Sequence, residues 1–525
     1  MMAGTTLTRE IRGVQASPHP GSLPKGEGDI ETSSHRAPTG GWAKLIRDLS
    51  LVGGTTVVCQ VLGVATSLLL RTLLDPAQIG LWQGLRMWLG LANYANLGAS
   101  KAAARDLSVA IGKNDLAAAQ RGLALANAVN WLGSLVFAIG LLSAAVWQAT
   151  SSAAGWRNGW AWGLAFVAGW ALLQRQYAFR VTLLRSQQNF RLASRLSLLE
   201  AALSLCLSAA AAWAWGVPGL CLAALVVLSA SWLVLQRCDS IRLQWAWNRG
   251  EIARLMAAGG PLMLAGLAAT LFASLDKWLI LALLPDGAYQ LGCYSLALLV
   301  TTQILGAGNF ISIVTGPRYA RLFGQTGGRG EVARLAAQVG QWQAALLGGL
   351  CGLAVIAGGP LLAWLLPKYE SGLVSLLWLM PGTLAASLAA PLGQYLAAVE
   401  GGRRTLAALI VGIAVAATGV CAALKLQLGL PGVAAAMSLA QLVCLAVLLR
   451  LSIWPELEAG ERRRYLAGLA WGFVPTLIPA AVPSWNAAGA SCWMLIGQGL
   501  ALWLVWCLLT AKQVKQMLRE QIWPV

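Results

Sequence analysis

Long apolar runs alternate with short charged clusters along most of the chain. The runs are about 18 to 25 residues long, the length that a helix needs to cross roughly 30 Å of hydrocarbon. A soluble core could contain one or two such runs, but it could not contain fourteen. The pattern predicts an all-α, polytopic membrane protein with about 14 transmembrane helices. The expected spans are 48–71, 79–98, 120–147, 159–183, 196–215, 219–236, 256–284, 289–314, 335–358, 371–397, 405–424, 432–450, 465–483 and 489–511.

Composition and the placement of charge agree with this interpretation. Hydrophobic residues make up 58% of the chain and charged residues only 11%, whereas soluble domains are about 25% charged. Of the 38 Lys and Arg residues, 32 lie in alternate segments that include the polar N-terminal tail, four lie in the other segments and two within spans; Arg175 is among the 32. This positive-inside pattern predicts cytoplasmic N- and C-termini. It also explains the net charge of +18 without any nucleic acid partner.

The chain also contains an internal repeat. The turn Gly216-Val217-Pro218-Gly219 recurs as Gly429-Leu430-Pro431-Gly432, and three further matches have similar offsets, between 210 and 213 residues. An even number of helices gives both copies the same orientation, so we expect two six-helix lobes related by a pseudo-twofold axis along the membrane normal. The expected organisation is a disordered cytoplasmic tail (1–41), an N-lobe (42–237), a cytoplasmic linker (238–255), a C-lobe (256–453), and two extra transmembrane helices with a cytoplasmic C-terminus (454–525).

Two blocks of sequence carry a resemblance to a known family. They are Leu69-Leu70-Arg71-Thr72-Leu73-Leu74-Asp75-Pro76 with the following Gly80, and Ser274-Leu275-Asp276-Lys277-Trp278-Leu279-Ile280 with the following Gly292. Over residues 45–450 the chain resembles the polysaccharide transporter and O-antigen flippase branch of the multidrug/oligosaccharidyl-lipid/polysaccharide exporter superfamily. The resemblance implies flipping of a polyprenyl-diphosphate-linked oligosaccharide across the bacterial inner membrane by alternating access. Such flipping serves the synthesis of cell-surface polysaccharides such as lipopolysaccharide or exopolysaccharide, with glycan polymerase and chain-length proteins as candidate partners.

Polar residues gather on one face of each of the first three spans. A diphosphate headgroup that crosses the bilayer must exchange its water for protein donors and positive charge, because an unpaired buried phosphate is very costly. Amides at helical spacing could line the required cavity, although they could also hold neighbouring helices together. We favour a shared hydrated cavity, with candidate substrate-binding amides Gln60, Gln83, Asn93, Asn127 and Asn130.

Ionisable residues within spans are stronger candidates for substrate binding, because a charged side chain is costly in the bilayer. Arg86 and Lys277 are each seven residues from the outer end of their expected span, so both should lie roughly 10 Å below the outer interface. We expect both to bind substrate phosphate, together with Arg71 at the outer interface. An Asp276–Arg86 ion pair between the lobes is a candidate outer gate. Alternatively, Lys277 and Arg71 extend towards the interface and Asp276 pairs with a neighbour.

Other functions fit the sequence less well. The two histidines, His19 and His35, lie in the polar tail, and no Walker loop, metal-ligand cluster or long loop is present, so we expect no enzyme activity, metal or cofactor. The main alternative is a cation-coupled multidrug exporter of the same superfamily, which needs acids within the membrane. Here Arg86 and Lys277 outweigh Asp276, which favours an anionic substrate. The glycan and the source of energy are not specified by the sequence.

Overall fold

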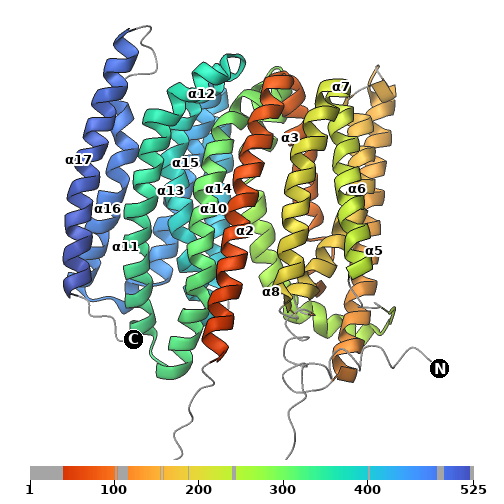
Figure 1. Ribbon diagram of the computed structural model, residues 1–525, viewed down its shortest axis with the longest axis horizontal. Coiled ribbons are helices and arrows are strands. Elements are labelled where there is room, and N and C mark those ends of the chain that lie inside the picture. Colours follow the sequence, from red (N-terminus) through yellow and green to blue (C-terminus); the bar gives the residue numbers. More distant parts are fainter. Residues whose placement is uncertain are drawn as a thin grey trace, which may run out of the picture.

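The fold is a bundle of long, mostly parallel and antiparallel helices (Figure 1). We analysed a computed structural model, which describes residues 40–100, 103, 116–153, 155–157, 159–186, 189–238, 244–399, 403–481 and 490–520. No strand occurs among these residues. A helix satisfies its own backbone hydrogen bonds, so this is one of the two architectures that can cross a bilayer.

The helices fall into three groups along the chain. The first group, which we call the N-bundle, comprises α2 (Gly40–Leu73), α3 (Pro76–Ala92), α5 (Leu116–Ser151), α6 (Gly159–Ser186) and α7 (Phe190–Cys238). The second, the C-bundle, comprises α8 (Arg249–Phe272), α9 (Leu275–Leu283), α10 (Gly287–Thr326), α11 (Arg329–Leu353), α12 (Gly359–Leu365), α13 (Glu370–Val399), α14 (Arg403–Lys425) and α15 (Gly429–Leu451). The last two helices are α16 (Ala459–Ala481) and α17 (Ala490–Glu520).

Each expected span coincides with a helix or a bent helical pair, so the prediction of an all-α polytopic membrane protein is confirmed. By length and apolar composition alone, eight of the described helices could cross a membrane, or nine if the bent pair α8–α9 is one span. The expected ends are less accurate than the spans. The second span was placed at 79–98, but α3 ends at Ala92 and residues 93–98 form turns.

The long element α7 is a hairpin of two antiparallel helices. Gly216 interrupts it with a φ of +62°, a value that glycine adopts without steric cost. A Cβ placed on Gly219 would lie 2.0 Å from the Ala211 carbonyl oxygen, a contact that requires the chain to reverse between the two residues. The matching residue at the start of α15, Gly429, also has a positive φ, of +59°. This agreement supports the proposed repeat.

The N-bundle and C-bundle meet most closely where α3 crosses α10. A Cβ on Gly80 would lie 1.6 Å from the Ala288 carbonyl oxygen, and one on Gly292 would lie 1.8 Å from the Pro76 carbonyl oxygen. The two contacts are reciprocal at a single offset, since 288 − 76 and 292 − 80 both equal 212. Reciprocal contacts of this kind characterise a twofold interface. They favour a pseudo-twofold axis that passes between α3 and α10.

The last two helices pack on α11, at the edge of the C-bundle. Glycines allow the close approach of α16, since a Cβ on Gly348 would lie 2.0 Å from the Gly472 carbonyl oxygen. Helix α17 is anchored by indole hydrogen bonds, from Trp503 to the Gly349 carbonyl at 2.8 Å and from Trp506 to the Trp471 carbonyl at 3.1 Å.

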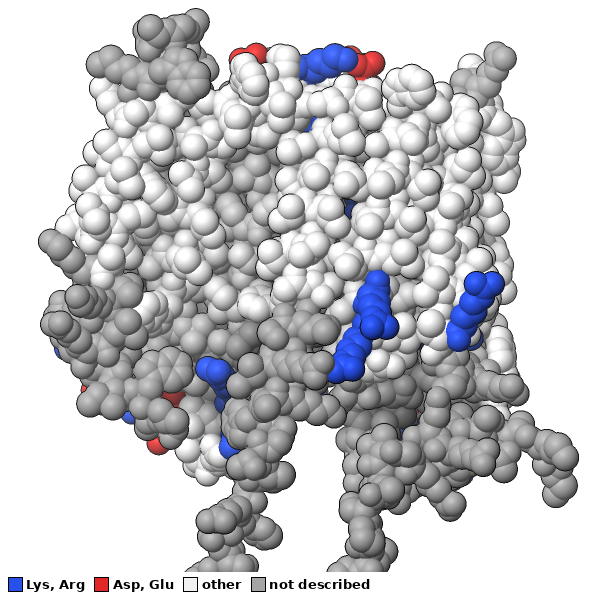
Figure 2. Space-filling model, in the orientation of Figure 1, with Lys and Arg blue, Asp and Glu red and all other residues white. Residues whose placement is uncertain are grey.

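On the face that Figure 2 shows, most charged side chains of the described residues lie towards the two ends of the molecule. Figure 2 shows a broad belt of uncharged residues, with basic side chains on the viewed face towards the end at which α2 begins. The last helix, α17, ends on that same side (Figure 1). A multi-pass membrane location follows from the apolar belt. We propose that the end at which α2 begins faces the cytoplasm, as the charge distribution predicts, and we call the opposite end the outer end.

Replacing Gly292 with alanine should destabilise the crossing of α3 and α10, because the new Cβ would meet the Pro76 carbonyl. Overpacking of this kind costs about 1–3 kcal/mol, and we expect a lower Tm for the purified protein. Gly140→Ala is the matched control, since a Cβ there meets nothing within 4 Å. Equal Tm values for the two variants would contradict the close contact between the bundles.

Candidate functional site

Arg86 lies on the face of α3 that is directed towards the C-bundle. Gly90, one turn further along the same face, is close to α8, since a Cβ there would lie 3.8 Å from Thr270 Cγ2. The Arg86 side chain is accessible to solvent, although protein atoms surround it densely. A group with both properties lines a space inside the protein and does not face lipid. Among the described residues, no hydrogen-bond or ion-pair partner of Arg86 is present, so its guanidinium is available to a ligand.

A buried network of amides surrounds a second arginine, Arg175 of α6, which exposes only 5% of its surface. Its guanidinium donates to Asn93 Oδ1 at 3.0 Å and to Asn130 Oδ1 at 3.1 Å. Asn130 in turn donates to Gln176 Oε1 at 3.0 Å, and Asn96 donates to Asn130 Oδ1 at 3.3 Å. The turn after α3 supplies Asn93 and Asn96, while α5 supplies Asn130. The described residues provide neutral amide oxygens, and no carboxylate, to this buried cation.

The assignment of Arg175 to a cytoplasmic loop is therefore wrong, and this residue is the main omission from the predicted site. It is 16 residues from the start of α6, or roughly 24 Å from the outer end of that helix. The sequence did contain a signal for it, because residue 175 lies inside the expected span 159–183. It was overlooked because it was grouped with the four arginines that follow it in the sequence (Arg180, Arg185, Arg191 and Arg195).

Lys277 lies in the first turn of α9, just after the break between α8 and α9, where the chain bends by 46°. A break in a membrane helix leaves carbonyl groups without their usual partners. The Lys277 ammonium donates to one of them, the Ala273 carbonyl, at 2.7 Å. In this conformation the side chain thus stabilises the break with one of its three N–H donors, and its predicted contact with substrate does not require that it leave this carbonyl.

The depths of Arg86 and Lys277 differ, contrary to expectation. Helix α3 begins three residues before the expected start, at Pro76, which places Arg86 ten residues from the outer end; Lys277 is six residues from the end of α9. At 1.5 Å per residue these depths are roughly 15 Å and 9 Å. The two cations therefore do not form a matched pair at one level.

Asp276 does not form the expected ion pair with Arg86 in this conformation. Its side chain exposes 3% of its surface and accepts a hydrogen bond from the Tyr294 hydroxyl at 2.9 Å. The backbone amide of Lys277 donates to the other carboxylate oxygen at 2.8 Å. Asp276 thus joins α9 to α10 inside the C-bundle. Of the alternatives that the sequence allowed, pairing with a neighbour is the one observed.

Arg71 connects the two bundles near their outer end. It exposes 2% of its surface and donates to the Ser295 carbonyl at 2.9 Å and to the Ser295 hydroxyl at 3.0 Å. It also donates to the Ser67 carbonyl at 2.8 Å within its own helix. Nearby, the Tyr369 hydroxyl donates to the Leu74 carbonyl at 2.8 Å. In this conformation Arg71 closes the outer seam, and its predicted binding of substrate would require the seam to open.

The remaining predicted amides do not share one cavity. Gln60 lines a groove of about 410 Å³ with Gln303 of α10, at the contact between the bundles. Gln83 lies on the Arg86 face of α3 and is partly exposed. Asn127 donates to the Gln244 carbonyl at 3.2 Å and so anchors the segment before α8. Asn93 and Asn130 alone of the five join the network around Arg175.

The described interior is more basic than acidic. Arg71 and Arg86 are close enough for their charges to interact unfavourably. The partly buried Glu200 of α7 lies beside Tyr177 and Arg185. Asp276 is held within the C-bundle. Among the described residues, no group of His, Cys, Asp or Glu could hold a metal ion. The site can therefore offer positive charge and amide groups to an anion.

Comparison with known proteins assigns the fold to a class of membrane transporters. The lipid II flippase MurJ, in an inward closed conformation, has a TM-score of 0.65 and 11% identity over 88% of this chain and 99% of that one. A multidrug resistance MATE family transporter of the MOP superfamily, in an inward-facing conformation, has a TM-score of 0.61 and 18% identity over 78% and 95%. A MOP superfamily transporter from Pyrococcus furiosus, whose structure is described as having a binding pocket of reverse polarity, has a TM-score of 0.55 and 17% identity over 81% and 95%.

The family described as polysaccharide biosynthesis protein matches residues 129–334. Together with the fold, this match confirms the predicted resemblance to the polysaccharide transporter and flippase family. The matched segment contains Arg175 and Lys277, whereas Arg86 precedes it. No curated protein sequence matches the chain at a significant level.

Replacing Arg175 with lysine should weaken the amide network, because one ammonium group cannot reproduce the planar fork that spans Asn93 and Asn130. A hydrogen bond to a charged group contributes about 1.5–3 kcal/mol, so we expect a clearly lower Tm. Arg191→Lys, at an exposed position of α7, is the matched control. If both variants melt like the unmodified protein, the network has no structural role.

Proposed function

We propose that this protein flips a polyprenyl-diphosphate-linked oligosaccharide across the bacterial inner membrane for the synthesis of a cell-surface polysaccharide. The observation that carries the proposal is the free guanidinium of Arg86, which lines an internal space between the bundles. Arg175 adds a second buried cation without a carboxylate partner among the described residues. A diphosphate is the kind of ligand that would compensate this charge, because hydrogen bonds between guanidinium and phosphate are strong in a low-dielectric interior.

The contacts between the bundles suit alternating access. In this conformation Arg71 and Tyr369 close the outer seam. If the bundles separate at their outer end, opening the seam breaks these hydrogen bonds and also parts α3 from α10 at the glycine contacts beside them. Substrate phosphate that draws Arg71 or Lys277 from its present carbonyl partner would favour the open state, since a ligand shifts an equilibrium by its difference in affinity for two states.

A cation-coupled drug exporter fits the site less well. Such a protein needs acids that are free to bind a proton, a sodium ion or a cationic drug within the membrane. Asp276 is held by Tyr294 and the backbone of Lys277, and Glu200 lies beside Tyr177 and Arg185. The family match also favours a glycan pathway. We therefore assign the cavity to an anionic substrate.

Deleting the gene should cause the lipid-linked oligosaccharide to accumulate on the cytoplasmic leaflet, where it can be measured by its access to an impermeant reagent in oriented vesicles. Arg86→Ala should restore roughly one tenth or less of the translocation rate, because a lost charged hydrogen bond corresponds to roughly a tenfold or larger effect. Arg86→Lys should restore more than Arg86→Ala. Lys277→Ala should also reduce translocation.

Lys425→Ala, at an exposed position at the end of α14, is the control and should restore translocation fully. Full rescue by both Arg86→Ala and Lys277→Ala would contradict the site. If the deletion strain shows no accumulation but retains cationic dyes, a drug exporter becomes the better assignment.

A further inference from the structure

A second cavity, distinct from the Arg86 site, opens between the bundles towards their outer end. It has a volume of about 890 Å³ and is lined by Trp88, Trp147, Trp160 and Trp278, with Gln148 and Asp286 among its polar residues. This volume is within the range of small-molecule sites. We call it the tryptophan cleft. Its walls come from α3, α5 and α6 of the N-bundle and from α9 and the start of α10 of the C-bundle.

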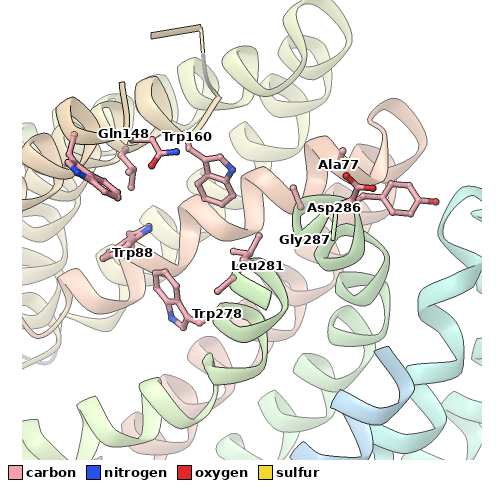
Figure 3. Close-up of a pocket in the computed structure, with 13 residues that line it drawn as sticks. Ala77, Trp88, Gln148, Trp160, Trp278, Leu281, Asp286 and Gly287 are labelled. Atoms are coloured by element: carbon pink, nitrogen blue, oxygen red, sulfur yellow. The ribbon is translucent and has the colours of Figure 1, made fainter. Parts of the chain in front are cut away.

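The indole rings are arranged along the cleft and do not fill it. Trp88 of α3 and Trp278 of α9 meet edge to face across the seam, with ring centroids 4.7 Å apart and an interplanar angle of 84°. Figure 3 shows the Gln148 side chain beside Trp160, with the Trp88–Trp278 pair nearby and Asp286 at the other end. Aromatic rings and groups that can form hydrogen bonds therefore both line the cleft.

Several polar groups of the cleft have no hydrogen-bond partner among the described residues. Trp88, Trp147 and Trp278 form no indole hydrogen bond within the described part of the chain. Trp471, Trp503 and Trp506 of the last two helices, by contrast, all donate to protein acceptors. Asp286 precedes α10 with a φ of +51°, yet its side chain does not cap the helix. A non-glycine residue held in the left-handed backbone region costs free energy, and strained residues of this kind are often found at binding sites.

These features select one class of ligand. An acyl chain could cover the rings, but it has no partner for indole N–H groups, an amide or a carboxylate. A pyranose has an apolar C–H face, whose partial positive charge suits the negative face of an aromatic ring, and hydroxyl groups at its edge. We propose that the tryptophan cleft binds pyranose rings of the transported glycan on the outer side of the membrane. The identity of the sugar as part of the transported glycan rests on the proposed function.

The position of the cleft links sugar binding to the movement of the bundles. Trp88 and Trp278 belong to opposite walls, so rocking of the bundles changes their separation and the fit of a sugar ring. Arg86 lies two residues before Trp88 on α3. Residues two apart on a helix point to nearly opposite sides, so the cleft and the Arg86 site lie on different faces of α3.

Binding of a soluble sugar tests the proposal with the purified full-length protein in lipid nanodiscs. Titration calorimetry with cellopentaose, an unbranched chain of glucose pyranoses, should show binding. Mannitol, which has hydroxyl groups but no ring face, should not bind detectably. Trp278→Leu, which retains apolar volume but removes the flat ring and its N–H, should weaken cellopentaose binding roughly three- to tenfold.

Gln148→Leu should also weaken cellopentaose binding. Because this variant leaves the Trp88–Trp278 packing unchanged, it serves as the test if Trp278→Leu proves unstable. Trp213→Leu, at a 78% exposed position on the α7 hairpin, should bind cellopentaose like the unmodified protein. Absence of cellopentaose binding, or equal affinity in Trp278→Leu, Gln148→Leu and Trp213→Leu, would overturn the proposal.

The leaflet assay separates this inference from the proposed function. If cellopentaose does not bind but the gene is still required for translocation, the cleft is not a sugar site and the flippase proposal remains. If cellopentaose binds through Trp278 but deletion causes no accumulation of the glycolipid, the sugar site remains and the flippase proposal is wrong.

Discussion

The account depends on positive charge held in the low-dielectric interior between two helical bundles. Burying a guanidinium without compensation is costly, because its solvation is lost. The protein reduces this cost for Arg175 with the amide oxygens of Asn93 and Asn130, and for Arg71 with serine oxygens across the seam. Arg86 has no such partner among the described residues and must be stabilised by water or by a bound anion. An interior of this kind is electrostatically more favourable for an anion than for a cation.

The same helices that carry these charges also hold the bundles together. Helix α3 carries both Arg86 and Gly80, and Gly80 allows its close crossing with α10. Helix α2 ends near Arg71, which binds Ser295 of α10. Close packing at glycine contacts is sensitive to small displacements, whereas hydrogen bonds such as Arg71–Ser295 can break and form again. Separation of the bundles at the outer end, with loss of the glycine contacts and of the hydrogen bonds beside them, is thus a physically reasonable route between states.

The sequence predicted the fold well because membrane helices obey strong constraints. Length, apolarity and the lack of charge identify a span without any knowledge of its neighbours, and the Gly-X-Pro-Gly turns marked both hairpins. The site was less predictable because it depends on which partner each side chain meets. Asp276 could have paired with Arg86 or Tyr294, and spacing along one helix does not distinguish the two. Arg175 was misplaced because loop arginines follow it, and Asn127 proved to hold the linker before α8.

The most direct test of the central claim is the affinity of the purified protein in nanodiscs for geranyl diphosphate, a short analogue of a polyprenyl diphosphate. The account predicts binding that falls roughly tenfold or more in Arg86→Gln. It also predicts no comparable binding of the lipophilic cation tetraphenylphosphonium. Unchanged affinity for the diphosphate in Arg86→Gln, with tight binding of the cation, would contradict a positively charged interior that selects an anionic headgroup.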